Sequence, residues 1–167
     1  MRVLKKQRNS KMCIICGMDN ENGVKAQFYN MEDNSVISPF EYSESHQSYP
    51  GRVHGGMITA MLDEVGLRAI WTTEADVWGV TMSLETKFRK PVPYGEKLYA
   101  VGKVVSSTHR FIKSKAYIYD GEGNNLAEAD LKYIKLLPEM ISDSDCHEEM
   151  HYYVEDDVKE IDTPWIK

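Results

Sequence analysis

Apolar side chains cover almost the whole circumference of one segment, residues 55–71, which begins with two glycines. Successive residues of a helix are turned by about 100°, so these side chains would point in every direction around its axis. They are Met57, Ile58, Ala60, Met61, Leu62, Val65, Leu67, Ala69, Ile70 and Trp71. A helix that is apolar on all sides is surrounded by protein. The pattern therefore predicts one long helix buried in the middle of the domain.

Elsewhere the chain favours β-strands, because Val, Ile, Thr and Tyr are frequent and turn residues separate the runs. The predicted strands before the helix are 24–29 and 36–42, and those after it are 77–92, 97–107, 111–120 and 126–137. One small sheet covers only one side of a helix, so we expect the sheet to wrap around it and a second subunit to cover part of the rest. The predicted fold class is α+β, an antiparallel sheet of about five to six strands around one central helix.

The length of 167 residues suits a single domain with a substantial core. The hydrophobic content of 42% and the charged content of 28% are ordinary for a soluble protein. No run approaches the roughly 18 apolar residues that cross a bilayer. No apolar stretch follows the basic N-terminus, which argues against a secretory signal. With three cysteines there is no even set of disulfides, so we expect a cytoplasmic protein without a membrane partner.

Charge is distributed unevenly along the chain. Residues 139–167 hold ten acidic and two basic residues, a net charge of −8, which leaves +2 for residues 1–138. We therefore expect a flexible N-terminal arm (1–12), a folded domain (13–138) and an acidic C-terminal extension (139–167) that either docks on the body or stays partly disordered. The body could receive an anionic small molecule, but no basic stripe predicts a nucleic-acid partner.

Gly55 and Gly56, at the start of the predicted helix, leave backbone N–H groups open to a ligand. The first turn of a helix has unpaired donors and the positive end of the helix dipole, which suit an anion or a polarised carbonyl oxygen. This is the geometry of an oxyanion hole. The alternative is that the glycines only let the preceding loop turn into the helix.

Two adjacent acids, Asp63 and Glu64, lie in the middle of this apolar helix. Burying a carboxylate is costly unless it is paired or hydrogen-bonded. Glu64 has Arg68 four residues further on, which is the spacing of a helical ion pair. Asp63 has no such local partner, and burial would raise its pKa toward the range that suits a general base or a nucleophile.

His54 and Asp63 cannot act on one small group within a single chain. The nine positions between them correspond to about 13 Å along the helix axis and about 180° around it. If both residues take part in catalysis, two chains must supply them. We therefore predict a homodimer with a two-fold axis, in which each site combines the helix N-terminus of one subunit with Asp63 of the other.

The spacing Cys13-x-x-Cys16 also occurs in zinc and redox sites. Zinc needs four ligands, no second pair of this kind follows, and Cys146 and His147 are distant in sequence. A redox pair usually opens a helix after a strand, unlike the polar sequence that follows Cys16. We interpret the cysteines as small residues packed near the first strand, and we expect no metal.

These features together resemble the hotdog-fold acyl-CoA thioesterases of the PaaI-like group. The resemblance rests on His-Gly-Gly at 54–56 followed by Asp63, and it extends over residues 13–137. It includes the opening Cys-x-x-Cys-Gly, the loop 47–56, the strand 79–83 and the stretch 89–96. The resemblance implies a sheet curled around the central helix, dimers that join two sheets edge to edge and an active site between subunits. A further pairing of dimers into tetramers stays open.

The resemblance also implies an activity, the hydrolysis of an acyl-CoA to a carboxylic acid and coenzyme A. The N–H group of Gly55 or Gly56 would polarise the thioester carbonyl, and Asp63 of the other subunit would act as general base or nucleophile. Thr81 would position the water, and His54 would orient the loop or lie near the carbonyl. No cofactor is expected, since coenzyme A enters as part of the substrate.

One position departs from the family pattern. Several relatives carry Asn six residues before the histidine, where this chain has Ser48 preceded by Gln47. Either side chain could hydrogen-bond a water or the carbonyl. The acyl pocket could be lined by Tyr49, Met57, Met61, Trp78 and Met82, and the phosphates of coenzyme A could be contacted by Arg89, Lys90, His109 and Arg110.

Two other functions stay open on the same fold. A hydratase or dehydratase that acts on acyl thioesters would use a histidine and an acid at a different spacing, and His54 is the candidate histidine. A non-catalytic acyl-CoA-binding or sensing module would keep the pocket but would have little use for an unpaired Asp63. Hydrolysis assays on an Asp63 variant separate these functions.

Overall fold

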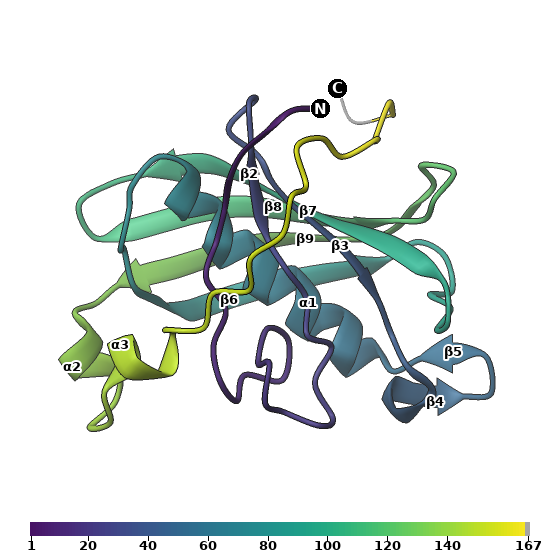
Figure 1. Ribbon diagram of the computed structural model, residues 1–167, viewed down its shortest axis with the longest axis horizontal. Helices are drawn as coiled ribbons and strands as arrows, with labels where there is room; N and C mark the ends of the chain where they lie inside the picture. Colours follow the sequence, from purple (N-terminus) through teal and green to yellow (C-terminus); the bar gives the residue numbers. More distant parts are fainter. Residues whose placement is uncertain (166–167) are drawn as a thin grey trace.

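One curved antiparallel sheet of seven strands packs around a single long helix in this computed structural model, which describes residues 1–165 (Figure 1). The strands are β1 (Val3–Lys6), β2 (Tyr29–Met31), β3 (Val36–Glu41), β6 (Gly79–Phe88), β7 (Lys97–Ser107), β8 (Phe111–Tyr119) and β9 (Asn125–Lys135). Their order across the sheet is β1-β2-β3-β7-β8-β9-β6. The predicted α+β architecture is confirmed, with one strand more than expected.

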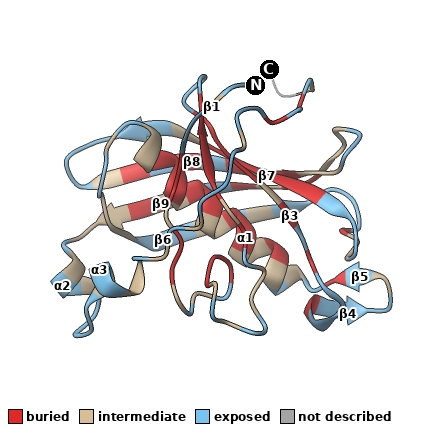
Figure 2. Cartoon of the chain, viewed as in Figure 1, coloured by how far each residue is buried: buried red, intermediate tan, exposed pale blue. Residues whose placement is uncertain are grey.

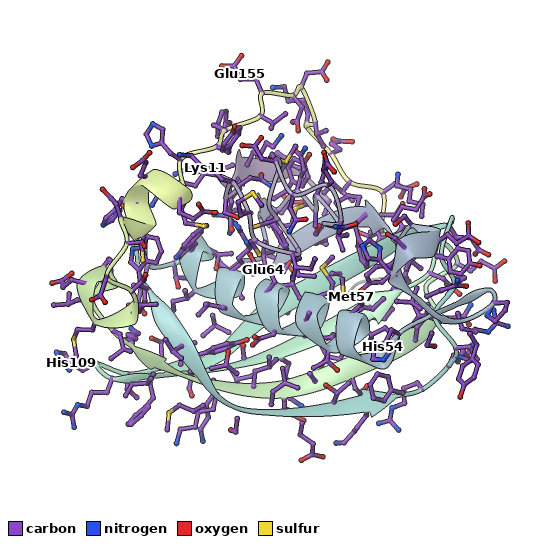
Figure 3. All side chains as sticks on the ribbon, turned by 90° about the horizontal axis from the view of Figure 1, so that it is seen from below. Lys11, His54, Met57, Glu64, His109 and Glu155 are labelled. Atoms are coloured by element: carbon purple, nitrogen blue, oxygen red, sulfur yellow. The ribbon has the colours of Figure 1, made fainter. Side chains whose placement is uncertain are left out.

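The long helix α1 (Gly55–Arg68) continues into the short 3-10 helix η2 (Ala69–Thr72). Its buried residues join an apolar core with inward-facing side chains of the sheet. The N-terminal segment covers the opposite side of α1, where Ile15 and Phe28 belong to the same core (Figure 3). The prediction that protein surrounds the helix is confirmed, and much of this cover comes from the same chain.

The strand predictions after the helix agree with the structure to within two or three residues at most ends. The predicted 97–107 coincides with β7, and 111–120 with β8 plus one residue. The predicted strand 24–29 is wrong, because only Tyr29 belongs to β2. Ala26 and Phe28 are buried in a loop. Their apolar character reflects burial on α1 rather than pairing in the sheet, and a run of six residues cannot separate these two causes.

The prediction of a flexible arm in residues 1–12 is also wrong. Val3–Lys6 forms an edge strand paired with β2, and Lys6 and Asn9 are buried. The Asn9 side chain donates hydrogen bonds to the carbonyl oxygens of Cys16 and Ala26, at 2.8 and 2.9 Å. Polar composition suggested disorder, but these polar groups have buried partners that lie elsewhere in the sequence.

The acidic extension docks on this same N-terminal segment. After two short helices, α2 (Pro138–Ile141) and α3 (Cys146–Glu149), the chain runs antiparallel to the first residues (Figure 1). Backbone bridges join Arg2 to Glu160 and Asn9 to Tyr152. Lys6 and Asp156 form an ion pair at 2.5 Å, so the basic start of the chain and its acidic end neutralise each other. No helix among the described residues is long and apolar enough to span a membrane.

Strand β6 ends the sheet on the side opposite β1, and no strand pairs with its outer edge within residues 1–165. Most of its residues are exposed, in contrast to the buried middle of β7 and β8 (Figure 2). Val80 and Met82 are 40% and 50% exposed although both are apolar. An unpaired edge with exposed apolar side chains is a natural place for another strand to add.

Candidate active site

One stripe of α1 runs along the edge strand β6. Every fourth residue of the helix meets a residue of the strand, in antiparallel order, because i and i+4 lie on the same side of a helix. Gly55 lies against Phe88, Thr59 against Thr86, Asp63 against Thr81 and Leu67 against Gly79. The helix N-terminus and the acid therefore occupy two different positions along the same edge.

The carboxylate of Asp63 is held by the hydroxyl of Thr81. The Thr81 Oγ1 donates to both carboxylate oxygens, at 2.8 Å to Oδ1 and 3.1 Å to Oδ2. Burial raises the pKa of Asp63 above its ordinary value, and the neighbouring Glu64 charge raises it further, while the Thr81 hydrogen bond opposes the shift. Thr81 therefore lies at the acid, and its predicted role in positioning a water stays a prediction.

Tyr133 on β9 fixes the helix at the level of the acid, a role that the sequence did not reveal. Its hydroxyl donates to the backbone carbonyl of Asp63 at 2.9 Å. This approach requires a glycine at position 66, because a Cβ there would lie 2.6 Å from the Tyr133 hydroxyl. A tyrosine 70 residues away in sequence thus fixes the position of the Asp63 backbone relative to strand β9.

His54 caps α1 and changes the role expected for Gly56. The Nδ1 atom of His54 accepts a hydrogen bond from the Gly56 N–H at 2.9 Å, so Gly56 is not a free donor. The expectation that Gly56 could polarise a substrate is therefore corrected. The Gly55 N–H, at the first helical position, has no acceptor among the described residues and stays open.

A groove of about 440 Å³ lies beside Gly55. Phe88 and Ile58 form part of its floor, and Arg52, Arg89 and Lys90 lie along it. Arg89 contacts Glu128 at 2.6 Å, and Lys90 donates to Asn124 at 2.7 Å. The structure therefore places two predicted phosphate contacts, Arg89 and Lys90, next to the helix N-terminus. It adds Arg52, which precedes Gly55 by three residues, and Phe88, which strand β6 brings to Gly55; sequence reasoning missed both.

A small hairpin precedes α1 and carries three predicted site residues. Its strands are β4 (Gln47–Tyr49) and β5 (Arg52–Val53), and it follows the 3-10 helix η1 (Glu44–His46). Gln47, Ser48 and Tyr49 are all exposed, close in sequence to the helix start. The His54 N–H donates to the carbonyl of His46 at 2.8 Å, which ties the hairpin to the first turn. The predicted roles of these three side chains stay predictions.

Comparisons with known proteins identify the fold and the superfamily that part of the chain resembles. The family model described as "Thioesterase superfamily" matches residues 50–127, which include the hairpin turn, α1 and β6 to β8. A crystal structure of a thioesterase superfamily protein superimposes with a TM-score of 0.67 and 27% identity, and covers 73% of this chain and 59% of that one. The chain thus spans about three fifths of that protein's length. The chain therefore has the hotdog fold, and its residues 50–127 are similar to the thioesterase superfamily.

Two other similar proteins are informative. A hypothetical thioesterase of Streptococcus pneumoniae, crystallised with coenzyme A, has a TM-score of 0.60 and 20% identity, and covers 66% of this chain and 85% of that one. A protein of Saccharolobus solfataricus, named provisionally as an esterase, is 28% identical over 108 residues, which is 65% of this chain and 71% of the relative. The first likeness shows the fold, and the second extends over about two thirds of this chain.

The remaining predicted contacts do not gather in the groove. His109 lies beyond the opposite end of α1 from His54 (Figure 3), and Arg110 is next to it. Neither lines the groove beside Gly55 in the same chain. Met57 is half-buried against the core, and Met82 is half-exposed on β6.

Glu64 faces away from the Asp63 side of the helix. Its carboxylate accepts a hydrogen bond from the Nε of Arg68 at 2.7 Å, so the predicted ion pair is confirmed. The same carboxylate lies next to Cys13 and Cys16, and the three ligand atoms are all within 4.8 Å of one another. Sequence reasoning missed this cluster, because it considered the cysteines without the helix that packs on them.

Proposed function

We propose that this protein is an acyl-CoA thioesterase that works as a homodimer with two equivalent sites. The observation that carries this proposal is the Asp63–Thr81 pair, a half-buried carboxylate with a raised pKa on the open edge of the sheet. The match of residues 50–127 to the thioesterase superfamily model supports the reaction class. The acyl-CoA substrate is inferred from the basic groove at Gly55 and is compatible with a superfamily structure described with coenzyme A.

Two chains are needed because the donor and the acid are too far apart in one. Gly55 and Asp63 are separated by eight helical residues, about 12 Å along the axis. Pairing of β6 with β6 of a second copy around a two-fold axis would reverse the strand direction. The Phe88 end of one strand, with its Gly55, would then lie beside the half of the partner that carries Asp63 and Thr81.

The proposed chemistry follows from this arrangement. The Gly55 N–H donates to the carbonyl oxygen of the thioester and stabilises the negative charge that develops on it. Asp63 of the other subunit either removes a proton from a water that attacks the carbonyl carbon, or attacks the carbon itself to form an anhydride that water then cleaves. In either route the C–S bond breaks, coenzyme A leaves as a thiolate that is protonated, and a carboxylic acid is released.

Binding of the substrate would use two regions of each site. The pantetheine arm and phosphates would follow the groove lined by Arg52, Arg89 and Lys90. The acyl group would enter an apolar hollow of about 230 Å³ that begins one helical turn beyond Asp63, where Leu67 and Trp78 line it. An apolar cavity of about 150 Å³ holds benzene, so this hollow has room for an aryl or medium-length acyl group.

The proposal is tested by thiol release from a panel of acyl-CoAs with short, long and aryl acyl groups. The variant is Asp63→Asn, which keeps the size of the side chain, and the matched control is Asp130→Asn on the exposed face of β9. We expect Asp63→Asn to lose about 10²-fold or more of kcat while it still binds coenzyme A. The control should retain activity.

Three results would overturn this assignment. Binding of acyl-CoA by the wild type without thiol release would make the protein a non-catalytic binding module. Conversion of an enoyl-CoA to a hydroxyacyl-CoA without thiol release would make it a hydratase. Full activity of Asp63→Asn in a protein that does hydrolyse acyl-CoA would move the catalytic role to another residue.

A further inference from the structure

Three potential metal ligands converge on the side of α1 that faces the N-terminal segment. Cys13 and Cys16 come from a tight turn in that segment, and Glu64, which Figure 3 labels, comes from the helix. Their ligand atoms lie within 4.8 Å of one another, and the Cys13 sulfur is 3.8 Å from Oε2 of Glu64. Zinc–sulfur bonds of about 2.3 Å and zinc–oxygen bonds of about 2.0–2.2 Å place such atoms about 3.5 Å apart in a tetrahedral site.

We propose that Cys13, Cys16 and Glu64 bind a zinc ion that fixes the N-terminal segment to α1. Two thiolates and a carboxylate suit zinc and disfavour magnesium and calcium, which prefer oxygen ligands alone. Binding of zinc would release the two thiol protons. The three ligands line the hollow that the proposed acyl group would enter, so the zinc site would adjoin the thioesterase site. Metal binding is measured without hydrolysis, so the two proposals can fail separately.

The two oxygens of Glu64 have separate partners. Arg68 donates its Nε proton to Oε1 at 2.7 Å, which leaves Oε2 directed toward Cys13. Ligating carboxylates are commonly oriented in this way by a second residue that does not touch the metal. Arg68 is 3% exposed and is anchored by its Nη1 to the carbonyl of Arg8 at 2.9 Å. The direction of the third ligand is therefore set before a metal arrives.

Charge also favours this site. Two thiolates and one carboxylate carry −3, and zinc with the Arg68 guanidinium carries +3, so the occupied cluster would be neutral. The Nη2 atom of Arg68 is buried and has no acceptor within residues 1–165. A buried donor without a partner is costly, and an anionic sulfur nearby would supply the missing electrostatic partner.

The turn itself presents the first sulfur to backbone donors. The N–H groups of Ile15 and Cys16 point to the Cys13 sulfur at 3.3 and 3.5 Å, an arrangement that stabilises a thiolate. Gly17 closes the turn with a hydrogen bond from its N–H to the Cys13 carbonyl at 2.8 Å. A Cβ at this position would lie 2.4 Å from the same carbonyl oxygen, so the turn requires glycine.

The fourth position of the zinc would face the hollow of about 230 Å³, which all three ligands line. This hollow gives the ion an entry path and gives a water molecule room to complete a tetrahedral site. Cys146 lies outside the cluster, since its sulfur contacts the carbonyl of Pro138 at 3.7 Å. The site therefore draws on the N-terminal segment and α1 alone.

The test is titration of the reduced, chelator-treated protein with cobalt(II), which reports thiolate ligands through its charge-transfer absorption. We expect one cobalt per chain with a sulfur-to-cobalt band, displacement of cobalt by zinc, and a higher Tm in the presence of zinc. Cys16→Ser should abolish the band, and Glu64→Gln should weaken binding at least tenfold. Cys146→Ser is the matched control and should bind like the wild type.

A wild-type protein that binds no cobalt in its reduced state would overturn the proposal, as would equal binding by Cys16→Ser. Native mass spectrometry of the unmodified chain supplies a measurement that does not depend on how the variants fold. An added mass of one zinc per chain, removed by chelator, supports the site. No added mass at a tenfold excess of zinc contradicts it. Thioester hydrolysis is not a readout in either experiment.

Discussion

Thr81 on the edge strand donates its hydroxyl proton to both carboxylate oxygens of Asp63 on the central helix, at 2.8 and 3.1 Å. This contact joins the two elements of the fold that would meet a second subunit. It also limits the rise in the pKa of Asp63, because the hydrogen bond favours the charged form that burial disfavours. The chemistry of the proposed site therefore depends on this pair and on the residues that hold it.

Removal of the Thr81 hydroxyl should disturb the acid specifically. Thr81→Val keeps the shape and the strand preference of the side chain but deletes the hydrogen bond, so we expect kcat to fall about tenfold or more. The matched control is Thr86→Val on the same strand, whose hydroxyl lies near Thr59 and not near an acid. Steady-state thiol release from acyl-CoA compares the two variants, and an equal loss in both would contradict a special role for Thr81.

The pH dependence of hydrolysis should reflect the raised pKa of Asp63. The active form is the carboxylate, so kcat/KM should rise with pH through the pKa of this group, above the ordinary carboxyl value of about 4. Thr81→Val should move this acid limb to still higher pH, because the lost hydrogen bond had lowered the pKa. A pH–rate profile of each protein measures the limb, and an unshifted limb in the variant would exclude Asp63 as the group that titrates.

The raised pKa of Asp63 should also make the stability of the folded protein depend on pH, and stability should fall where activity rises. A carboxyl group with a pKa raised by folding holds its proton more tightly in the native state, so its contribution to stability is lost as pH rises through the folded pKa. Asp63→Asn removes this effect. The Tm of the variant relative to wild type should therefore increase between about pH 4 and neutral pH. Thermal unfolding followed by circular dichroism measures it, and a relative Tm that falls with pH would contradict the assignment.

His54 should be replaceable by another capping residue. Its Nδ1 accepts from Gly56, and Asn is among the preferred helix caps. We expect His54→Asn to retain stability and most of the activity, and His54→Ala to lose about 1 kcal/mol of unfolding free energy. Urea unfolding and thiol release give the two quantities. A stable His54→Asn protein that loses about 10²-fold in kcat would show that the imidazole contacts the substrate.

The outer edge of β6 should control assembly and activity together. Met82→Lys places a charge on the exposed edge strand and should weaken the dimer, because a buried unpaired charge is costly. Val105→Lys is the control, since Val105 is 60% exposed on the central strand β7. Sedimentation velocity should show more monomer for Met82→Lys alone, and its activity per chain should fall on dilution. Undiminished activity of the monomer would exclude a site shared between chains.

Much of this arrangement was predictable from local spacing. The apolar pattern of 55–71 predicts a buried helix because its period is set by the helix itself. The four-residue spacing of Glu64 and Arg68 predicts their ion pair, which the structure contains at 2.7 Å. The rise per residue of a helix likewise separates His54 from Asp63 by about 13 Å. These conclusions depend only on the geometry of one element.

The sequence by itself therefore determined the central helix, the strands that follow it and the acid at the centre of the candidate site. Only the tertiary structure decided which partners these residues meet: Thr81 and Tyr133 at Asp63, Cys13 at Glu64, and the C-terminal extension against β1. Those partners lie 18 to 70 residues away in the case of Asp63. These partners come together because of the order of the strands in the sheet and the route of the connections between them. The spacing of neighbouring residues in the sequence does not reveal either.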